Sequence, residues 1–170
     1  MTNLIYLLIA LILLVVISIL DSLSHQKFSK KGSLIFHFTG IPILFISGLI
    51  LAFNEFKFTI LIYLGILIGI IGLIIAYKGL VEIKPNLLKA GEVYKKGLFS
   101  KVRHPVYSGL ILSMIGLSLA VYSLVFLLYA LVAVIMLYWM AYYEEKHLIR
   151  RFGKKYLKYK EEVPMLIPRL

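Results

Sequence analysis

Residues Tyr107–Tyr143 read YSGLILSMIGLSLAVYSLVFLLYALVAVIMLYWMAYY, a run that contains no Asp, Glu, Lys or Arg. As one helix this run would extend about 55 Å at 1.5 Å per residue, whereas about 20 helical residues already cross the hydrocarbon core of a bilayer. The run therefore predicts a helical hairpin of two membrane passes, Tyr107–Ala120 and Ser123–Tyr143. The turn between them is expected near Ala120–Ser123, where no Gly or Pro marks it.

Three more apolar spans precede this hairpin, at Leu4–Leu20, Leu34–Phe53 and Thr59–Tyr77. Hydrophobic residues make up 61% of the chain, and its mean hydropathy is +0.94. A soluble domain holds about 45–50% apolar residues, and a soluble fold of this length could not bury the excess. We expect an all-α integral membrane protein with about five transmembrane helices, built as one domain over residues 1–170.

The basic residues indicate how the spans are oriented. The net charge is +11, and eighteen of the 19 Lys and Arg residues lie in Lys27–Lys31, Lys78–Arg103 and Lys146–Arg169, whereas the loop between the second and third spans holds only Lys57. Alternating loops that differ this sharply in positive charge follow the positive-inside rule. The pattern predicts an outer N-terminus and a cytoplasmic C-terminus, and it argues against a nucleic-acid partner.

Four parts follow from this topology. Residues 1–77 form a three-span scaffold, 78–106 a cytoplasmic loop, 107–143 the hairpin and 144–170 a cytoplasmic tail. In the scaffold, Gly65 and Gly69 form a G-x-x-x-G with Gly72 on a neighbouring ridge, a spacing that lets helices approach closely. The chain has no Cys, and no group of side chains has the spacing of a metal site.

Polar side chains gather where the fourth span begins. Arg103 and His104 precede Pro105, a residue that suits the first turn of a helix. The first turn of a helix offers unpaired N–H groups and the positive end of the helix dipole, both of which favour an anion. This segment predicts either an anion-binding helix start or an ordinary basic helix end at the membrane interface.

A second polar group lies where the fifth span ends. Glu144 and Glu145 directly follow the aromatic residues Trp139, Tyr142 and Tyr143, which are typical of a membrane interface. Since the two spans form a hairpin, the glutamates should neighbour Arg103 and His104. Adjacent helical residues point about 100° apart, so we expect the two glutamates to have different roles. Beyond them, an apolar face of Ile149, Phe152, Tyr156 and Tyr159 opposite Lys and Arg predicts an amphipathic helix on an anionic leaflet.

Both groups resemble one family. Gly97–Gly109, read GLFSKVRHPVYSG, is similar to the R-H-P-x-Y-x-G signature of the isoprenylcysteine carboxyl methyltransferase and phospholipid methyltransferase superfamily. Glu144 and Glu145, with the Leu, Phe-Gly and two Tyr residues that follow, resemble its E-E-x-x-L-x-x-x-F-G-x-x-Y-x-x-Y tail. The resemblance covers roughly Tyr94–Pro168 and leaves the first three spans without a signature.

The resemblance implies an enzyme that transfers a methyl group from S-adenosylmethionine to a lipophilic small-molecule or lipid-modified acceptor at the membrane boundary. It implies a cofactor site at the end of the loop, the R-H-P-x-Y segment and the glutamate pair. The cofactor contacts it implies are Lys95, Gly97, Leu98, His104, Pro105, Tyr107, Gly109, Glu144 and Glu145. The catalytic residues it implies are Arg103, Glu144 and Glu145.

Two alternatives stay open. A sterol-reductase-type membrane enzyme that uses NADPH has a similar C-terminal region, although such proteins carry Asn where this chain has Val106. A non-catalytic membrane scaffold is the second alternative, but charges at the bilayer boundary are costly to retain without a use. The acceptor also stays open between a prenylated Cys carboxylate, a phospholipid amine and another lipophilic molecule.

Overall fold

The computed structural model describes residues 5, 9, 12, 16, 46–48, 50, 59–86 and 92–169, and these residues are helical or in loops, without a strand. The predicted spans Leu4–Leu20 and Leu34–Phe53 lie almost wholly outside the described residues. The N-terminal residues, whose outer position was predicted, lie outside them as well. The ordered elements are α3 (Leu61–Ile83), the 3-10 turns η1 (Lys84–Asn86) and η2 (Gly97–Ser100), α4 (Pro105–Val121), α5 (Leu124–Phe152) and α6 (Lys154–Glu162).

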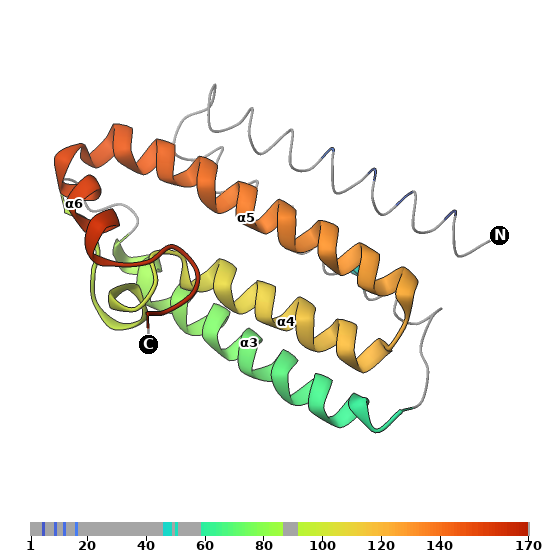
Figure 1. The fold of residues 1–170 in the computed structure, drawn as a ribbon. Helices are drawn as coiled ribbons and strands as arrows, with labels where there is room; N and C mark the ends of the chain where they lie inside the picture. The colour runs from blue at the N-terminus through green and yellow to red at the C-terminus, as the bar shows by residue number, and fades with distance from the viewer. Residues whose placement is uncertain are drawn as a thin grey trace.

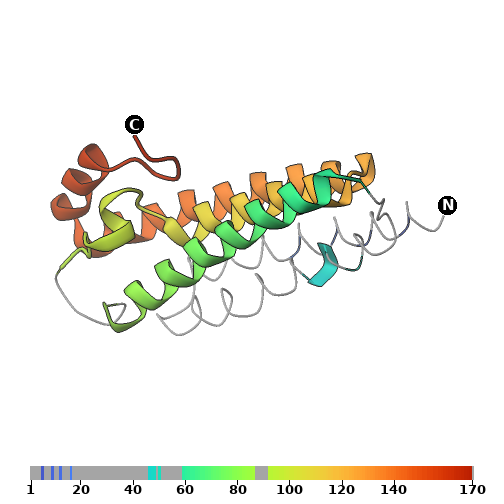
Figure 2. The ribbon, with the colours of Figure 1, turned by 90° about the horizontal axis from the view of Figure 1, so that it is seen from below.

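The helices α3, α4 and α5 run alongside one another, with α4 between the other two (Figure 1). The view from below shows the same arrangement, and α6 and the C-terminal end of the described chain lie together at one end of the bundle (Figure 2). The helix α4 packs along most of α3 and contacts α5 less extensively.

The predicted hairpin is present in the structure. Pro105 is the first residue of α4, as expected from its fixed φ angle. The helix ends at Val121, and the φ of 50° at the following residue, Tyr122, places Tyr122 in the left-handed region. Ser123 then caps α5 by accepting a hydrogen bond from the backbone N–H of Phe126. The turn therefore falls inside the predicted interval, and a Tyr adopts a conformation that Gly more commonly supplies.

Two helices, α3 and α5, are long and apolar enough to cross a membrane by length and composition, and the 17-residue α4 is a shorter apolar helix. Their outward surfaces are apolar. On α3, Tyr63 is 71% exposed and Leu67 56% exposed, and on α5, Leu131 is 57% exposed.

Small residues bring α3 and α4 into backbone contact. A Cβ added to Gly65 would lie 2.5 Å from the N atom of Ala120 and 2.6 Å from the O atom of Gly116. A Cβ on Gly72 would lie 2.5 Å from Ser113 Oγ. The hydroxyl of Ser113 also donates across the interface to the Gly69 carbonyl at 3.2 Å. The predicted small-residue ridge is confirmed, and its tightest positions are Gly65 and Gly72.

The helices extend further than the apolar runs predict. The helix α3 continues six residues past Tyr77 to Ile83, because no residue before Pro85 breaks it. The helix α5 passes Tyr143 and continues to Phe152, so both glutamates lie within it. Hydropathy marks where a segment leaves an apolar environment, which need not be where the helix ends.

The structure also corrects the predicted surface helix. Gly153, with φ of 55°, separates α5 from α6, so the apolar face does not belong to one continuous helix. Tyr156 and Tyr159 are each 2% exposed and pack with Val163, with Val93, Leu148, Ile149 and Phe152 around them. The aromatic face of α6 is therefore buried inside the protein and does not face a leaflet.

We expect Gly65→Ala to lower the thermal stability of the purified protein. The added methyl group would collide with backbone atoms of α4, and overpacking of this kind costs about 1–3 kcal/mol. Thermal unfolding in detergent measures the effect.

Gly69→Ala is the matched control on the same helix. A Cβ at Gly69 meets only the Ser113 carbonyl, at 3.9 Å, which is an ordinary contact. Equal melting temperatures for the two variants would contradict the close approach of α3 and α4 at Gly65.

Candidate functional site

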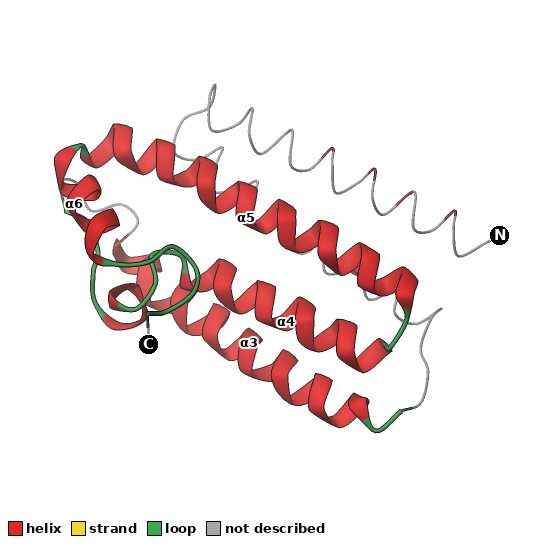
Figure 3. Ribbon diagram, in the orientation of Figure 1, coloured by secondary structure: helices red, strands yellow, loops and turns green. Residues whose placement is uncertain are grey.

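The start of α4 is covered by the C-terminal segment. The backbone N–H of Arg103 donates to the Pro164 carbonyl at 2.9 Å, and that of His104 donates to the Met165 carbonyl at 3.1 Å. The loop before α4 and the segment after α6 accordingly lie together at one end of the bundle (Figure 3). The backbone N–H groups directly before α4 are therefore used by the tail, and the predicted anion site at the first turn of the helix stays a prediction.

A buried ion pair joins Glu145, in α5, to Arg103, which lies just before α4. The Nε of Arg103 donates to Glu145 Oε1 at 2.6 Å, and the side chains of both residues are at most 6% exposed. The Nη1 of Arg103 donates to the carbonyls of Lys160 and Val163. The Nζ of Lys160 reaches Glu145 Oε2 at 2.9 Å. Arg103 therefore directs its donors into the protein, and both oxygens of Glu145 are engaged.

The charged and polar groups around Glu145 lower its pKa. Burial raises the pKa, but contacts with His104, Lys160 and Arg103, together with the positive charge of Arg103, outweigh burial and lower it from 4.5 to about 2. Glu145 is thus ionised at neutral pH and forms the negative centre of the cluster.

Glu144 has a different environment. Its side chain is 29% exposed, and its Oε2 lies 3.7 Å from His104 Nδ1. The other ring nitrogen of His104 lies 3.5 Å from Glu145 Oε1 and makes no hydrogen bond to the described residues. The two glutamates thus lie in different environments, since one is buried in an ion pair and the other borders solvent, and their different roles stay a prediction.

Two tyrosines from α6 complete the cluster. Tyr159 Oη donates to the Phe99 carbonyl at 2.5 Å. Tyr156 Oη is buried and has no hydrogen-bond partner among the described residues. Burial raises the pKa of Tyr156, and the nearby carboxylates of Glu145 and Glu144 raise it further, so its hydroxyl is a hydrogen-bond donor at neutral pH. A buried donor without an acceptor is costly, which makes Tyr156 a candidate ligand contact.

The loop before the cluster is held by a residue that the sequence reading passed over. Glu82, in the last turn of α3, accepts a hydrogen bond from the Leu98 N–H at 2.9 Å. Gly97 has φ of 57°, and a Cβ there would lie 2.6 Å from the carboxylate carbon of Glu82. Glu82 was missed because the helix was expected to end before it. Its charge directly after an apolar span was the available signal.

The remaining predicted cofactor residues lie at different distances from this cluster. Tyr107 is buried, and the centroid of its ring lies 5.8 Å from that of the His104 ring. Lys95 instead forms an ion pair with Glu162 at 3.2 Å. Gly109 packs on α3, where the backbone of Gly72 and Ala76 fills the space beside it. Gly109 thus serves helix packing in this structure. The described residues contain no group of three or more His, Cys, Asp or Glu that could hold a metal ion.

Taken together, the fold and the cluster describe a helical protein with lipid-compatible surfaces and a buried polar site where two distant motifs meet. The sequence model of the phospholipid methyltransferase family matches residues 60–155, more than half of the chain, and the chain belongs to that family. This confirms the resemblance seen in the sequence. No curated protein and no solved structure gives a match. The matched region ends within α6, before Tyr156 and the tail that covers Arg103.

Glu145→Gln should destabilise the protein more than Glu144→Gln. Loss of one partner from a buried ion pair costs about 3–5 kcal/mol, because the other charge stays buried without compensation. Glu144 borders solvent and makes a longer contact, so its loss should cost less than about 1 kcal/mol. Thermal unfolding of both variants in the same detergent measures the difference.

The pH dependence of that difference is a further test. A carboxylate whose pKa falls on folding stabilises the folded state above its ordinary pKa, and this contribution is lost as the pH falls toward the folded value. For Glu145 the loss spans pH 4.5 to about 2. The gap between the wild type and Glu145→Gln should therefore narrow below about pH 4.5. A gap that widens with acid would show that the pair with Arg103 is not formed.

Proposed function

We propose that this protein is an integral membrane methyltransferase that uses S-adenosylmethionine and acts on a lipophilic acceptor at the cytoplasmic membrane boundary. The observation that carries the proposal is the cluster of Arg103, His104, Glu144, Glu145 and Tyr156, in which two buried polar atoms make no hydrogen bond to the described residues. The family assignment supports methyl transfer as the reaction.

Several features support the membrane setting. Exposed side chains of Ile, Leu and Tyr follow α3 and α5, and an apolar surface of this extent is stable in lipid but not in water. The basic residues of the loop and tail favour the cytoplasmic side for the cluster. Five spans with an outer N-terminus remain the arrangement that we propose.

The residues of the cluster fit the chemical groups of this donor. S-Adenosylmethionine supplies an electrophilic methyl group on a sulfonium, and it also carries a carboxylate and an ammonium. Glu144, being partly exposed, can accept a hydrogen bond from an ammonium, and Tyr156 Oη can donate one to a carboxylate. His104 Nε2 makes no hydrogen bond to the described residues and could make one to the donor.

Within this proposal Arg103 is a positioning residue. Its guanidinium ties Glu145 to the carbonyls of Lys160 and Val163, and it thereby fixes α5 and the tail against the start of α4. Methyl transfer is a displacement in which alignment of the reacting atoms dominates, so a rigid surround is the main contribution expected of the protein.

The chemistry of the acceptor decides whether a base is needed. A carboxylate acceptor is already ionised and requires none. An amine acceptor has to lose a proton, and His104 or Glu144 could receive it. Membrane lipids surround the site in either case, and a lipid or lipid-modified acceptor could reach it from the bilayer.

The family assignment favours this proposal over the reductase alternative, because the matching family transfers methyl groups. Calorimetry with S-adenosylhomocysteine and NADPH on the detergent-solubilised protein tests the choice. We expect the adenosyl ligand to bind and NADPH not to bind. Binding of NADPH alone would support a reductase, and binding of neither would support a non-catalytic scaffold.

Tyr156→Phe should lower the affinity for S-adenosylhomocysteine without lowering stability. Its hydroxyl has no partner within the described protein, so folding loses nothing when it is removed. Loss of one hydrogen bond to the ligand corresponds to about 5- to 10-fold in affinity.

Tyr159→Phe is the control, because the Tyr159 hydroxyl donates to the Phe99 carbonyl. This variant should be less stable but should bind the ligand nearly as well as the wild type. If Tyr156→Phe binds like the wild type and melts at a lower temperature, the hydroxyl serves the fold and the proposed donor contact is wrong.

A further inference from the structure

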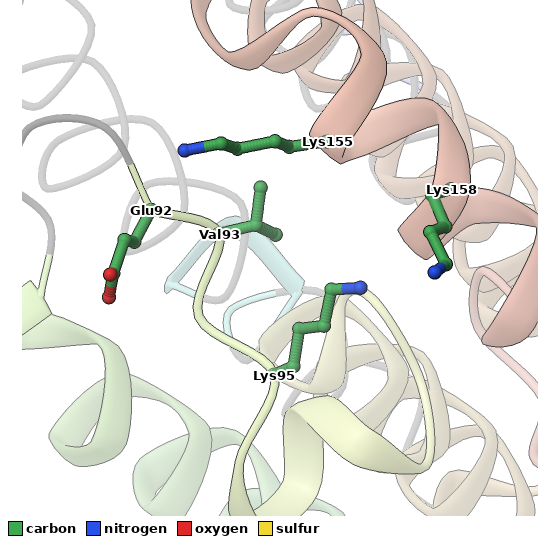
Figure 4. A pocket seen from close by; sticks show the side chains of 5 residues that line it. All are labelled: Glu92, Val93, Lys95, Lys155 and Lys158. Atoms are coloured by element: carbon green, nitrogen blue, oxygen red, sulfur yellow. The ribbon is translucent and has the colours of Figure 1, made fainter.

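A second polar feature lies between the loop that precedes η2 and the helix α6. The loop residues Glu92, Val93 and Lys95 and the α6 residues Lys155 and Lys158 line a cavity of about 330 Å³. Three lysines and one glutamate thus line one space, and the ammonium end of Lys155 points away from those of Lys95 and Lys158 (Figure 4).

The orientation of these side chains matters more than their number. In Figure 4, the ammonium ends of Lys95 and Lys158 are turned toward each other, and the carboxylate of Glu92 is turned away from both. Like charges that converge across a small space repel one another, and an anion between them removes the repulsion. Lys95 also pairs with Glu162 at 3.2 Å, whereas Lys158 has no ion pair with any described residue.

The cavity is separate from the proposed methyl-transfer site. None of Arg103, His104, Glu144, Glu145 and Tyr156 lines the cavity. The ring of Tyr159 contacts both regions, since its centroid lies 5.3 Å from Lys95 Nζ and 5.7 Å from the ring of Tyr156. Tyr159 is 2% exposed, and its hydrogen bond to the Phe99 carbonyl holds it in place.

We propose that this cavity binds a phosphate-bearing anion. Lysine recognises phosphate as a point charge, and the several oxygens of one phosphate can meet more than one ammonium group. The volume lies at the lower end of the range for small-ligand sites and suits a phosphate with a short polar substituent. The source is either the head group of an anionic lipid or a soluble phosphate ester.

The experiment uses the full chain and two probes. Inorganic phosphate is titrated into the detergent-solubilised protein at constant ionic strength, with chloride as the reference anion. In parallel, the protein is placed in nanodiscs of phosphatidylcholine with and without phosphatidylglycerol, and native mass spectrometry counts the lipid that it retains.

Lys158→Gln is the test variant, and Lys154→Gln is the matched control on the same helix, because Lys154 does not line the cavity. We expect Lys158→Gln to weaken binding about tenfold, the effect of losing one charge-assisted contact, and Lys154→Gln to leave it unchanged. Glu92→Gln should strengthen binding, because it removes the carboxylate at the cavity. Retention of phosphatidylglycerol alone would identify a lipid head group as the ligand, and binding of phosphate alone would identify a soluble one.

Equal losses in Lys158→Gln and Lys154→Gln would overturn the proposal, since general attraction to a basic surface would then explain the binding. If neither phosphate nor phosphatidylglycerol binds, the proposal is also overturned. S-Adenosylhomocysteine affinity, measured on the same variants, should not change. Failure of the donor to bind would contradict the proposed function and leave the phosphate result unaffected.

Discussion

The ion pair between Arg103 and Glu145 holds together three parts of the chain that are distant in sequence. Charges buried this deeply lose their hydration, and their mutual attraction offsets the loss only when the remaining hydrogen-bonding positions are filled. Here the carbonyls of Lys160 and Val163 fill them on the arginine, and Lys160 Nζ fills one on the glutamate. The start of α4, the end of α5 and the tail therefore have to assemble together, because each of them leaves a charge or a donor unpaired if it moves away.

That assembly depends on where α4 begins, and packing against α3 determines this position. The backbones of α3 and α4 touch at Gly65 and Gly72, so α4 has little freedom to slide along its neighbour. At the far end of the same interface, a Cβ on Gly79 would lie 3.1 Å from Pro105 Cγ. Glu82, one turn further on, holds the loop at Leu98. A single ridge of small residues thus positions both the helix start and the loop that leads into it.

The sequence predicts the parts of this arrangement that have local signals. Pro105 marks the start of α4, and the length of the apolar run requires a turn close to Tyr122. The hairpin then brings Arg103 near the two glutamates. The contacts of the tail have no comparable signal, because Arg103 and His104 bond to backbone carbonyls that any sequence could supply. The burial of Tyr156 and Tyr159 was equally hidden, since an aromatic stripe beside lysines reads the same whether it packs on lipid or on protein. Gly153 was the one local sign that the chain changes direction there.

The charge balance of the cluster bears on the acceptor. Arg103 and Lys160 carry two positive charges, and Glu144 and Glu145 carry two negative charges, so the four side chains sum to zero when His104 is counted as neutral. The proposed donor brings one net positive charge, since its ammonium and sulfonium outnumber its carboxylate. Within the proposed function, an anionic acceptor would restore neutrality at the cluster, whereas an uncharged amine would leave one net positive charge beside the buried pair of Arg103 and Glu145. This charge balance is, within the proposed function, a reason to test a carboxylate acceptor before an amine.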